Sequence, residues 1–283
     1  MPQKDDLLPT LGLDPRRIDD LLRGVAAAEI MPRFRNLARG EITEKRPGEI
    51  VTEADTAAER HLAAALADLV PGSVIVGEEG SELAPESLSL LDSSSPVWVI
   101  DPVDGTQNFA DGDDCFAVLL ALRRGGETLA GWIYAPVQDV VCRAVLGRGV
   151  MFDDDRPTAD IGEKPSEISD LTGCFGRRAK RNLEKLTKRA PGSPRPNLAP
   201  RYRCVGIEYF DVAGGSLDFV QYGGRLKPWD HLAGDLIVRE AGFTAALTEN
   251  GGTYAPGRDG IVEGSFLVAP SPKTWEQLRA LIS

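Results

Sequence analysis

An apolar segment that runs directly into two aspartates is the feature that most constrains the fold of this chain. Residues 97–100 read Val-Trp-Val-Ile, which is typical of a buried strand, and Asp101 and Asp104 follow at once. A turn accounts for one of them, and a second charge at the end of a buried strand is costly unless something neutralises it. Two carboxylates and the carbonyl oxygen of Val103 in one tight turn therefore indicate a site for a hard cation.

Three further acidic residues stand where the predicted secondary structure changes. Glu78 ends a short apolar strand, and Asp230 opens a helical pattern. Asp55 completes a Thr-x-x-Asp capping box with Thr52. Each also has a purely structural explanation, because a loop carboxylate, an N-cap and a capping box need no metal. The spacing of these residues leaves both explanations open.

Hydrophobic periodicity and turn residues predict a layered mixed α and β architecture. Helices are predicted over residues 15–40, 51–70, 178–189, 209–215 and 231–242. Strands are predicted over residues 73–79 and 97–100, in two runs joined by a Gly-Gly hairpin within 115–136, and over 139–154, 202–208 and 217–224. Loops are predicted over residues 80–96, 153–168 and 190–201. A seam near residue 150 divides the chain into two predicted halves, 1–150 and 151–283.

Composition excludes several classes of function. The net charge of −11 and the pI near 4.8 disfavour a nucleic-acid partner. No apolar run approaches the roughly 18 residues of a membrane span, and the first ten residues lack the apolar core of a secretory signal. We therefore expect a cytoplasmic protein without a membrane partner. Two histidines are few for a histidine-based mechanism, and both lie in predicted helices.

The four cysteines indicate neither a disulfide framework nor a zinc site. They lie far apart and form no C-x-x-C pair, so free thiols are predicted. Residues 142–148 do satisfy C-x5-R, the signature of cysteine-based phosphatases. Because the apolar residues around Cys142 alternate as in a strand, a phosphate-binding loop is not expected there.

Four motifs in order resemble the inositol monophosphatase family of magnesium-dependent phosphatases. The two long ones are "DPVDGTQNF" at residues 101–109 and "PWDHLAGDLIVREAG" at residues 228–242. The two short ones are "VTEAD" at residues 51–55 and "GEE" at residues 77–79. The likeness covers nearly the whole chain and is weakest over residues 153–200.

The resemblance implies a fold, a reaction and a metal. The fold is a layered αβαβα sandwich of the inositol monophosphatase and sugar phosphatase type. Residues 1–150 would carry most of the metal ligands, and residues 151–283 would carry Asp230 and the substrate pocket. The activity is a Mg²⁺-dependent phosphomonoesterase with two or three metal ions per site, in which Mn²⁺ can substitute. Homodimers and lithium sensitivity are further family expectations.

The resemblance also implies which residues bind the metal ions. Glu78, Asp101 and the carbonyl of Val103 would hold one Mg²⁺. Asp101, Asp104 and Asp230 would hold a second.

The resemblance likewise implies which residues take part in catalysis. Glu78 and Thr106 would orient the attacking water, with Asp55 behind Thr106 and near a third, weaker metal site. The backbone N–H groups of Gly105 and Thr106 would receive the phosphate.

Departures from the family pattern concern the substrate. Inositol-specific members carry an acid where this chain has Gly223, and their Gly-[ST]-Ala-Ala reads Gly-Ile-Glu-Tyr at residues 206–209. Substrate contacts are expected from Asp104, Asp230 and Glu208, although Glu208 would alternatively be a solvated strand residue.

The substrate class therefore stays open within one scaffold. An inositol-1-phosphate-like, sugar or polyol phosphate is expected. The alternatives are a 3′(2′),5′-bisphosphate nucleotidase, a histidinol phosphatase and a catalytically silent binding member.

Overall fold

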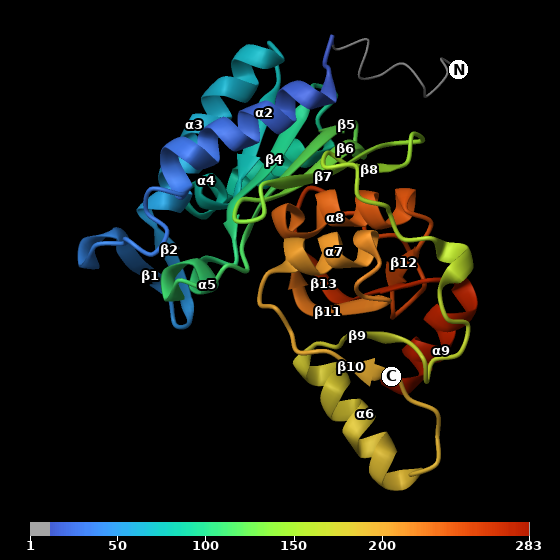
Figure 1. Cartoon of the computed structure of the whole chain (residues 1–283). Coiled ribbons are helices and arrows are strands. Elements are labelled where there is room, and N and C mark those ends of the chain that lie inside the picture. Colours follow the sequence, from blue (N-terminus) through green and yellow to red (C-terminus); the bar gives the residue numbers. More distant parts are fainter. Residues whose placement is uncertain (1–11, 283) are drawn as a thin grey trace.

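Two β-sheets, with helices on and between them, organise residues 12–282, which this computed structural model describes (Figure 1). The strand order is β3-β4-β5-β6-β7-β8 in the six-stranded sheet and β10-β9-β11-β13-β12 in the five-stranded sheet. The first ten residues, which bear on a secretory signal, lie outside the described region.

The elements have the following bounds. The six-stranded sheet consists of β3 (Val74–Gly77), β4 (Val97–Asp104), β5 (Ala117–Arg124), β6 (Glu127–Ala135), β7 (Val140–Val145) and β8 (Val150–Phe152). The five-stranded sheet consists of β9 (Thr172–Cys174), β10 (Asn197–Leu198), β11 (Phe219–Leu226), β12 (Thr244–Leu247) and β13 (Val262–Ala269). A separate hairpin pairs β1 (Ile42–Arg46) with β2 (Glu49–Thr52). The helices are α2 (Pro15–Val25), α3 (Glu53–Leu69), α4 (Glu78–Leu83), α5 (Thr106–Asp111), α6 (Arg177–Arg189), α7 (Val205–Gly214), α8 (Pro228–Glu240) and α9 (Pro272–Ile282).

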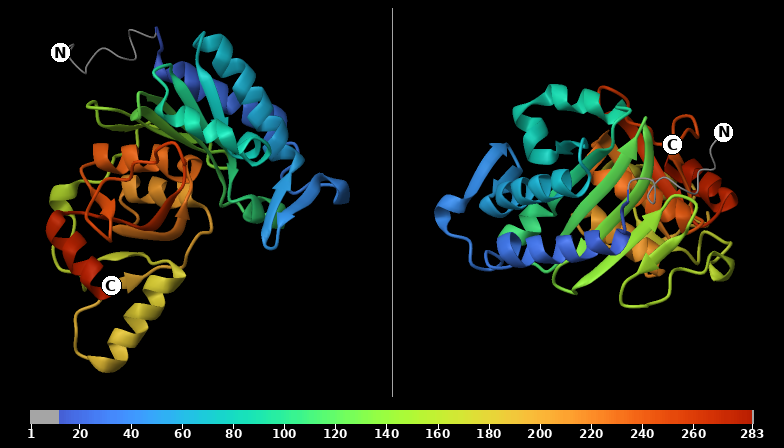
Figure 2. Two further views of the ribbon diagram at one scale, coloured as in Figure 1. Left: turned by 180° about the vertical axis from the view of Figure 1, so that it is seen from behind. Right: turned by 90° about the horizontal axis from the view of Figure 1, so that it is seen from above.

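Helices and sheets alternate in five layers, which confirms the expected αβαβα sandwich (Figures 1 and 2). Helices α2 and α3 cover the outer face of the six-stranded sheet, and α7 and α8 lie between the two sheets. Helices α6 and α9 cover the far face of the five-stranded sheet.

Residues 97–100 of β4 are all apolar because both faces of the strand are buried. Trp98 and Ile100 belong to the core beneath α2 and α3, whereas Val97 and Val99 belong to the core around α7 and α8. A strand between two helical layers needs apolar side chains on both faces, which explains the continuous run seen in the sequence.

Small residues bring α8 close to the six-stranded sheet. A Cβ at Gly131 of β6 would lie 2.9 Å from the Cα of Ala233 in α8, so only glycine permits this approach. The helix, with Asp230 in its first turn, is therefore held directly against the sheet.

Several predicted elements are confirmed. Helix α3 begins with the Thr52–Asp55 capping box, and α6 matches the predicted basic helix. The hairpin between β5 and β6 turns at Gly125 and Gly126, which both have positive φ.

The first predicted helix is too long. The helix starts at Pro15 with Asp14 as its N-cap, but it gives way to a π-helical turn over Ala26–Ile30 instead of continuing to residue 40. Pro32 has no N–H to donate, so the helical hydrogen-bond pattern loses a donor directly after this turn, although Met31 before it keeps a helical conformation.

Two other predictions are wrong. Residues 80–96 are no plain loop: α4 occupies the start and a 3-10 helix spans Pro85–Asp92. The strand predicted over residues 202–208 is absent, because α7 already begins at Val205. In both places a distant carboxylate accepts backbone N–H groups at the start of the helix: Glu59 for α4 and Asp104 for α7.

The cysteines and the helices agree with two further expectations. All four thiols are free, and Cys142 lies inside β7, where burial raises the pKa of the thiol. No helix among residues 12–282 combines the length and the apolar character of a membrane span.

Candidate active site

A bulge in the last part of β4, just before the turn at Gly105, presents Asp101 and Asp104. Asp101 pairs with Leu119 of β5 and Asp104 pairs with Ala117, so β4 uses one more residue than its partner between these two positions. Such a bulge re-aims side chains at the end of a strand. Gly105 then takes a φ of +88°, and a Cβ there would lie 3.0 Å from the carbonyl oxygen of Cys115.

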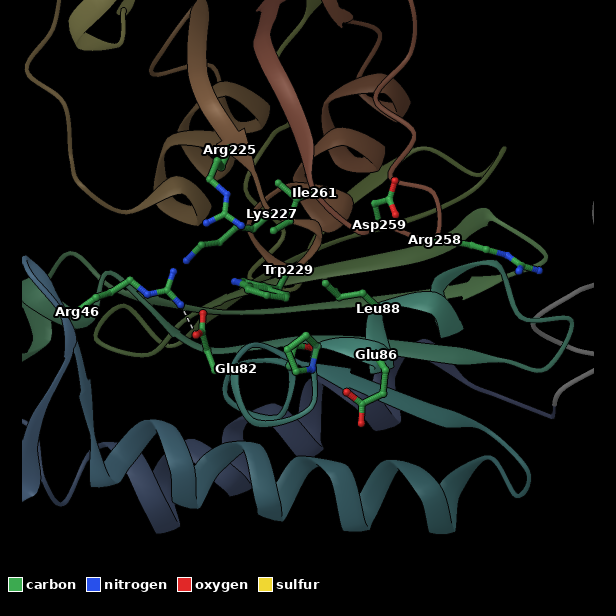
Figure 3. Close-up of a pocket in the computed structure, with 12 residues that line it drawn as sticks. Arg46, Glu82, Glu86, Leu88, Arg225, Lys227, Trp229, Arg258, Asp259 and Ile261 are labelled. Carbon is green, nitrogen blue, oxygen red and sulfur yellow. Dashed lines mark hydrogen bonds and ion pairs between the residues drawn. The ribbon is translucent and has the colours of Figure 1, made fainter.

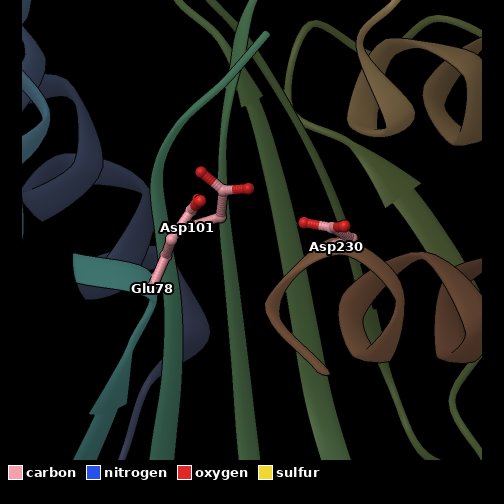
Figure 4. A group of neighbouring side chains, drawn as sticks. All are labelled: Glu78, Asp101 and Asp230. Carbon is pink, nitrogen blue, oxygen red and sulfur yellow. The ribbon is translucent and has the colours of Figure 1, made fainter. Parts of the chain in front are cut away.

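Three carboxylates from three separate segments converge at this turn. Glu78 follows β3, Asp101 belongs to β4, and Asp230 lies in the first turn of α8. One oxygen atom from each lies within 4.8 Å of the others, and Figure 4 shows the three side chains around a common space. They line a cavity of about 280 Å³. We call these three residues the acidic cluster.

Burial makes the negative charge of the acidic cluster unfavourable. Burial, followed by the charge of Glu78, raises the pKa of Asp101 and of Asp230 well above the usual range of an aspartate. A cation among these oxygens would offset both effects. Carboxylate oxygens are the ligands that Mg²⁺ and Mn²⁺ prefer, so the donor set fits a hard divalent metal ion.

Asp104 lies beside the acidic cluster but is partly engaged elsewhere. Its Oδ2 accepts a hydrogen bond of 2.5 Å from the N–H of Gly206 and one of 3.1 Å from the thiol of Cys204. The predicted metal ligand therefore also fixes the start of α7. A Cβ at Gly206 would lie 2.6 Å from Leu119, so this contact requires glycine.

Thr106 connects the turn to α3. Its hydroxyl lies 3.1 Å from Oδ1 of Asp55 and 3.0 Å from the carbonyl oxygen of Val103. The other oxygen of Asp55 accepts hydrogen bonds from the N–H and the hydroxyl of Thr52. Asp55 therefore caps a helix and contacts Thr106 at the same time. Burial raises its pKa to about 6, against the opposing effect of the Thr52 hydrogen bonds.

Two lysines at the site have no counterpart in the sequence analysis. Lys45 of β1 lies 3.4 Å from Oε1 of Glu78, and Lys227 lies 3.7 Å from the same atom. Lys227 stands two residues before the Trp of the "PWD" motif, and this position is the one signal that could have found it. Lys45 lies in a hairpin without any motif.

Glu208 lies away from the acidic cavity. Its side chain is fully buried in α7, so the alternative of a solvated strand residue is wrong. Oε1 pairs with Arg201 at 2.7 Å and accepts the N–H of Tyr202, while Oε2 has no hydrogen-bond partner among the described residues. Burial raises the pKa of Glu208 to about 7. Its contact with a substrate stays a prediction.

Comparison with known proteins identifies one family. The model of the inositol monophosphatase family matches residues 17–282. An inositol-1-monophosphatase of Bacillus subtilis is 31% identical over 212 residues, which cover 73% of this chain and 76% of that protein. A fructose-1,6-bisphosphatase/inositol-1-monophosphatase of Thermotoga maritima is 30% identical over 72% of this chain and 74% of that protein.

Solved structures agree on the fold. An inositol monophosphatase structure from Thermotoga maritima superposes with a TM-score of 0.75 at 23% sequence identity. The superposition covers 95% of this chain and 96% of that one.

Proposed function

The chain belongs to the inositol monophosphatase family, a family of phosphatases, and we propose that it hydrolyses a small phosphomonoester of a polyol or a sugar with Mg²⁺ as cofactor. The observation that carries the proposal is the acidic cluster. Side chains 152 residues apart (Glu78 to Asp230) meet in one cavity, and three carboxylates this close together, with Asp101 buried, are unfavourable without a cation.

Five residues would hold the metal ions. Glu78, Asp101 and the carbonyl of Val103 would bind one Mg²⁺, and Asp101, Asp104 and Asp230 would bind a second. A third, weaker ion would lie near Asp55. When bound, these ions would neutralise the phosphate and lower the pKa of the nucleophilic water. Mn²⁺ has the same preference for oxygen ligands and would substitute.

Side chains of the protein would orient the water. Thr106 donates its hydroxyl proton to Asp55, which leaves a lone pair of the hydroxyl free to accept a hydrogen bond from water. Glu78 would accept the second proton of that water. The N–H groups of Gly105 and Thr106 would hold the phosphate in line with the attack.

The leaving group is the open part of the proposal. An inositol phosphate or a related sugar phosphate is our first candidate, because the relatives named above act on inositol monophosphate or fructose 1,6-bisphosphate by name. Gly223 departs from the inositol-specific pattern, so a bisphosphate nucleotide and histidinol phosphate belong in the same substrate panel.

Phosphate release by the Asp230→Asn variant tests the proposal. We expect the rate with Mg²⁺ to fall at least about 100-fold, because the variant removes a ligand charge from the acidic cluster. Asp68→Asn makes the same change on the exposed face of α3 and should leave the rate unchanged. Equal inactivity of the wild-type protein and Asp230→Asn across the whole panel would contradict the enzyme proposal.

A further inference from the structure

A second cavity, next to the acidic one, has both cationic and acidic side chains in its lining. It measures about 530 Å³, and we call it the basic cavity. Its cationic lining residues are Arg46, Arg225, Lys227 and Arg258. Three carboxylates also line it, Glu82, Glu86 and Asp259, so the lining carries one net positive charge in a chain whose net charge is −11.

Three of these cations gather at one end of the basic cavity. Figure 3 shows the charged ends of Arg46, Arg225 and Lys227 directed toward the same space, whereas Arg258 lies at the opposite end and points away. They come from β1, from β11 and from the residue before α8. An arrangement assembled from three elements is more specific than a basic run along one surface.

The floor of this end carries a buried donor without an acceptor. Trp229 is 4% exposed and lines the basic cavity, and its Nε1–H has no hydrogen-bond partner among the described residues. Its nitrogen edge faces the three cations in Figure 3. A buried N–H without a partner costs free energy, and an oxygen atom of a ligand at this position would satisfy it.

Each of the three cations lies near a carboxylate, and the ion pair of Arg225 is the most exposed of these pairs. Arg225 lies 3.6 Å from Glu263, and both side chains are more than half exposed, so this ion pair contributes little. Arg46 forms an ion pair with Glu82 on the cavity wall and lies 3.8 Å from Glu49. Lys227 lies 3.7 Å from Glu78 and 3.9 Å from Glu49.

We propose that Arg46, Arg225, Lys227 and the indole N–H of Trp229 form a binding site for an oxyanion, such as a phosphate group, separate from the acidic cluster. Three cations and one N–H donor converging on a space match the charge and the several acceptor oxygens of such a group. Lys227 lines both cavities, so the oxyanion site directly adjoins the catalytic one.

The occupant is a free oxyanion or a separate phosphorylated metabolite rather than a distant part of the substrate. The basic cavity adjoins Glu78 through Lys227 and through Ser81 and Glu82 of α4. In the proposed function Glu78 lies on the side of the attacking water, and in-line displacement sends the leaving group to the opposite side. Only this choice of occupant rests on the proposed function.

Binding to the metal-free protein tests the site. Without metal ions the acidic cluster repels anions, so an observed oxyanion reports on the basic cavity. The probe is inorganic phosphate, with sodium chloride at matched ionic strength as the control. The readout is the indole N–H resonance of Trp229 in tryptophan-labelled protein, assigned by its loss in Trp229→Phe. We expect a saturable shift of this resonance with phosphate and none with chloride.

Two variants with the same charge change sharpen the test. Arg225→Gln should weaken phosphate binding about tenfold or more, because it removes a charge-assisted hydrogen bond. Arg258→Gln, at the far end of the cavity, should change the affinity less than about twofold, because exposed charges at that distance are screened. The absence of a Trp229 shift, or equal weakening by both variants, would overturn the proposal.

A second titration tests whether the cavity instead holds part of the substrate. A phosphomonoester is added to the metal-free protein in place of inorganic phosphate. A response to both ligands supports a separate oxyanion site. A response to the ester alone would show that the cavity holds part of the substrate and would overturn the assignment. Failure of the phosphatase proposal can be told apart from failure of the oxyanion site. A protein that hydrolyses no phosphomonoester but still shows the Trp229 shift refutes only the phosphatase proposal.

Discussion

At the scale of single residues, buried carboxylates outside the acidic cluster make the stability of the protein depend on pH. Glu208 is fully buried, pairs with Arg201 through one oxygen, and has a pKa raised to about 7. A carboxyl group whose pKa is raised in the folded state binds its proton more tightly there than in the unfolded chain. The stability that it contributes is complete below about pH 4.5 and is lost as the pH rises through about 7.

We therefore expect Glu208→Gln to flatten the pH dependence of stability between pH 4.5 and 7.5. The amide can still accept the N–H of Tyr202 but does not titrate. Urea titrations would measure the free energy of unfolding at each pH. Across this window it should decrease in Glu208→Gln by about 2–3 kcal/mol less than it decreases in the wild-type protein. The control is Glu276→Gln, which makes the same change at an exposed position of α9. Parallel pH profiles of the wild type and Glu208→Gln would contradict the assignment.

At the scale of elements, close packing of α8 holds Asp230 in the site. Gly234 of α8 lies against Tyr209 of α7, and a Cβ at Gly234 would overlap the tyrosine ring. The hydroxyl group of Tyr209 in turn forms a hydrogen bond of 2.9 Å with Nδ1 of His231. This arrangement gives His231 a structural role in the core, where burial lowers its pKa to about 3.

Two glycine-to-alanine variants in helices test this packing. Gly234→Ala should destabilise the protein by about 1–3 kcal/mol, because the added methyl group forces α7 and α8 apart. Gly24→Ala, at an exposed position of α2 with nothing near its Cβ position, should stabilise it by about 0.5–1 kcal/mol through helix propensity. Chemical denaturation measures both. Equal effects of the two variants would show that α7 and α8 do not pack as described.

At the scale of the whole molecule, the acidic cluster links separate parts of the fold. Asp101 belongs to the six-stranded sheet and Glu78 begins α4 directly after β3, whereas Asp230 belongs to the helical layer between the sheets. A ligand that binds only the folded arrangement stabilises the fold by mass action. Metal binding should therefore be visible as stability even without any substrate.

We expect Mg²⁺ or Mn²⁺ at 100 times its dissociation constant to stabilise the protein by about 2.7 kcal/mol. In a thermal unfolding experiment this corresponds to a rise in Tm of about 5 °C or more, reversed by EDTA. Asp101→Asn should lose most of the rise, whereas Asp68→Asn should keep it. If the metal raised the Tm of wild type and Asp101→Asn equally, the acidic cluster would not be the binding site.

The sequence by itself determined the elements whose signals are local. The capping box at Thr52, the hairpin at Gly125 and Gly126, and the apolar run before Asp101 each depend on neighbours a few residues away. Their conformations follow from backbone sterics, short-range hydrogen bonds and hydrophobic periodicity. The residues of the acidic cluster stand at the boundaries of such elements, but their role as metal ligands was predicted only from the motifs that resemble the inositol monophosphatase family.

Only the tertiary structure decided which distant side chains meet. Lys45 and Lys227 beside Glu78, and Asp104 at the start of α7, are contacts between segments that share no local pattern. Sequence spacing carries no distance between segments separated by whole elements, because packing of the layers sets that distance. For the same reason the early start of α7 and the burial of Glu208 became visible only in the folded molecule.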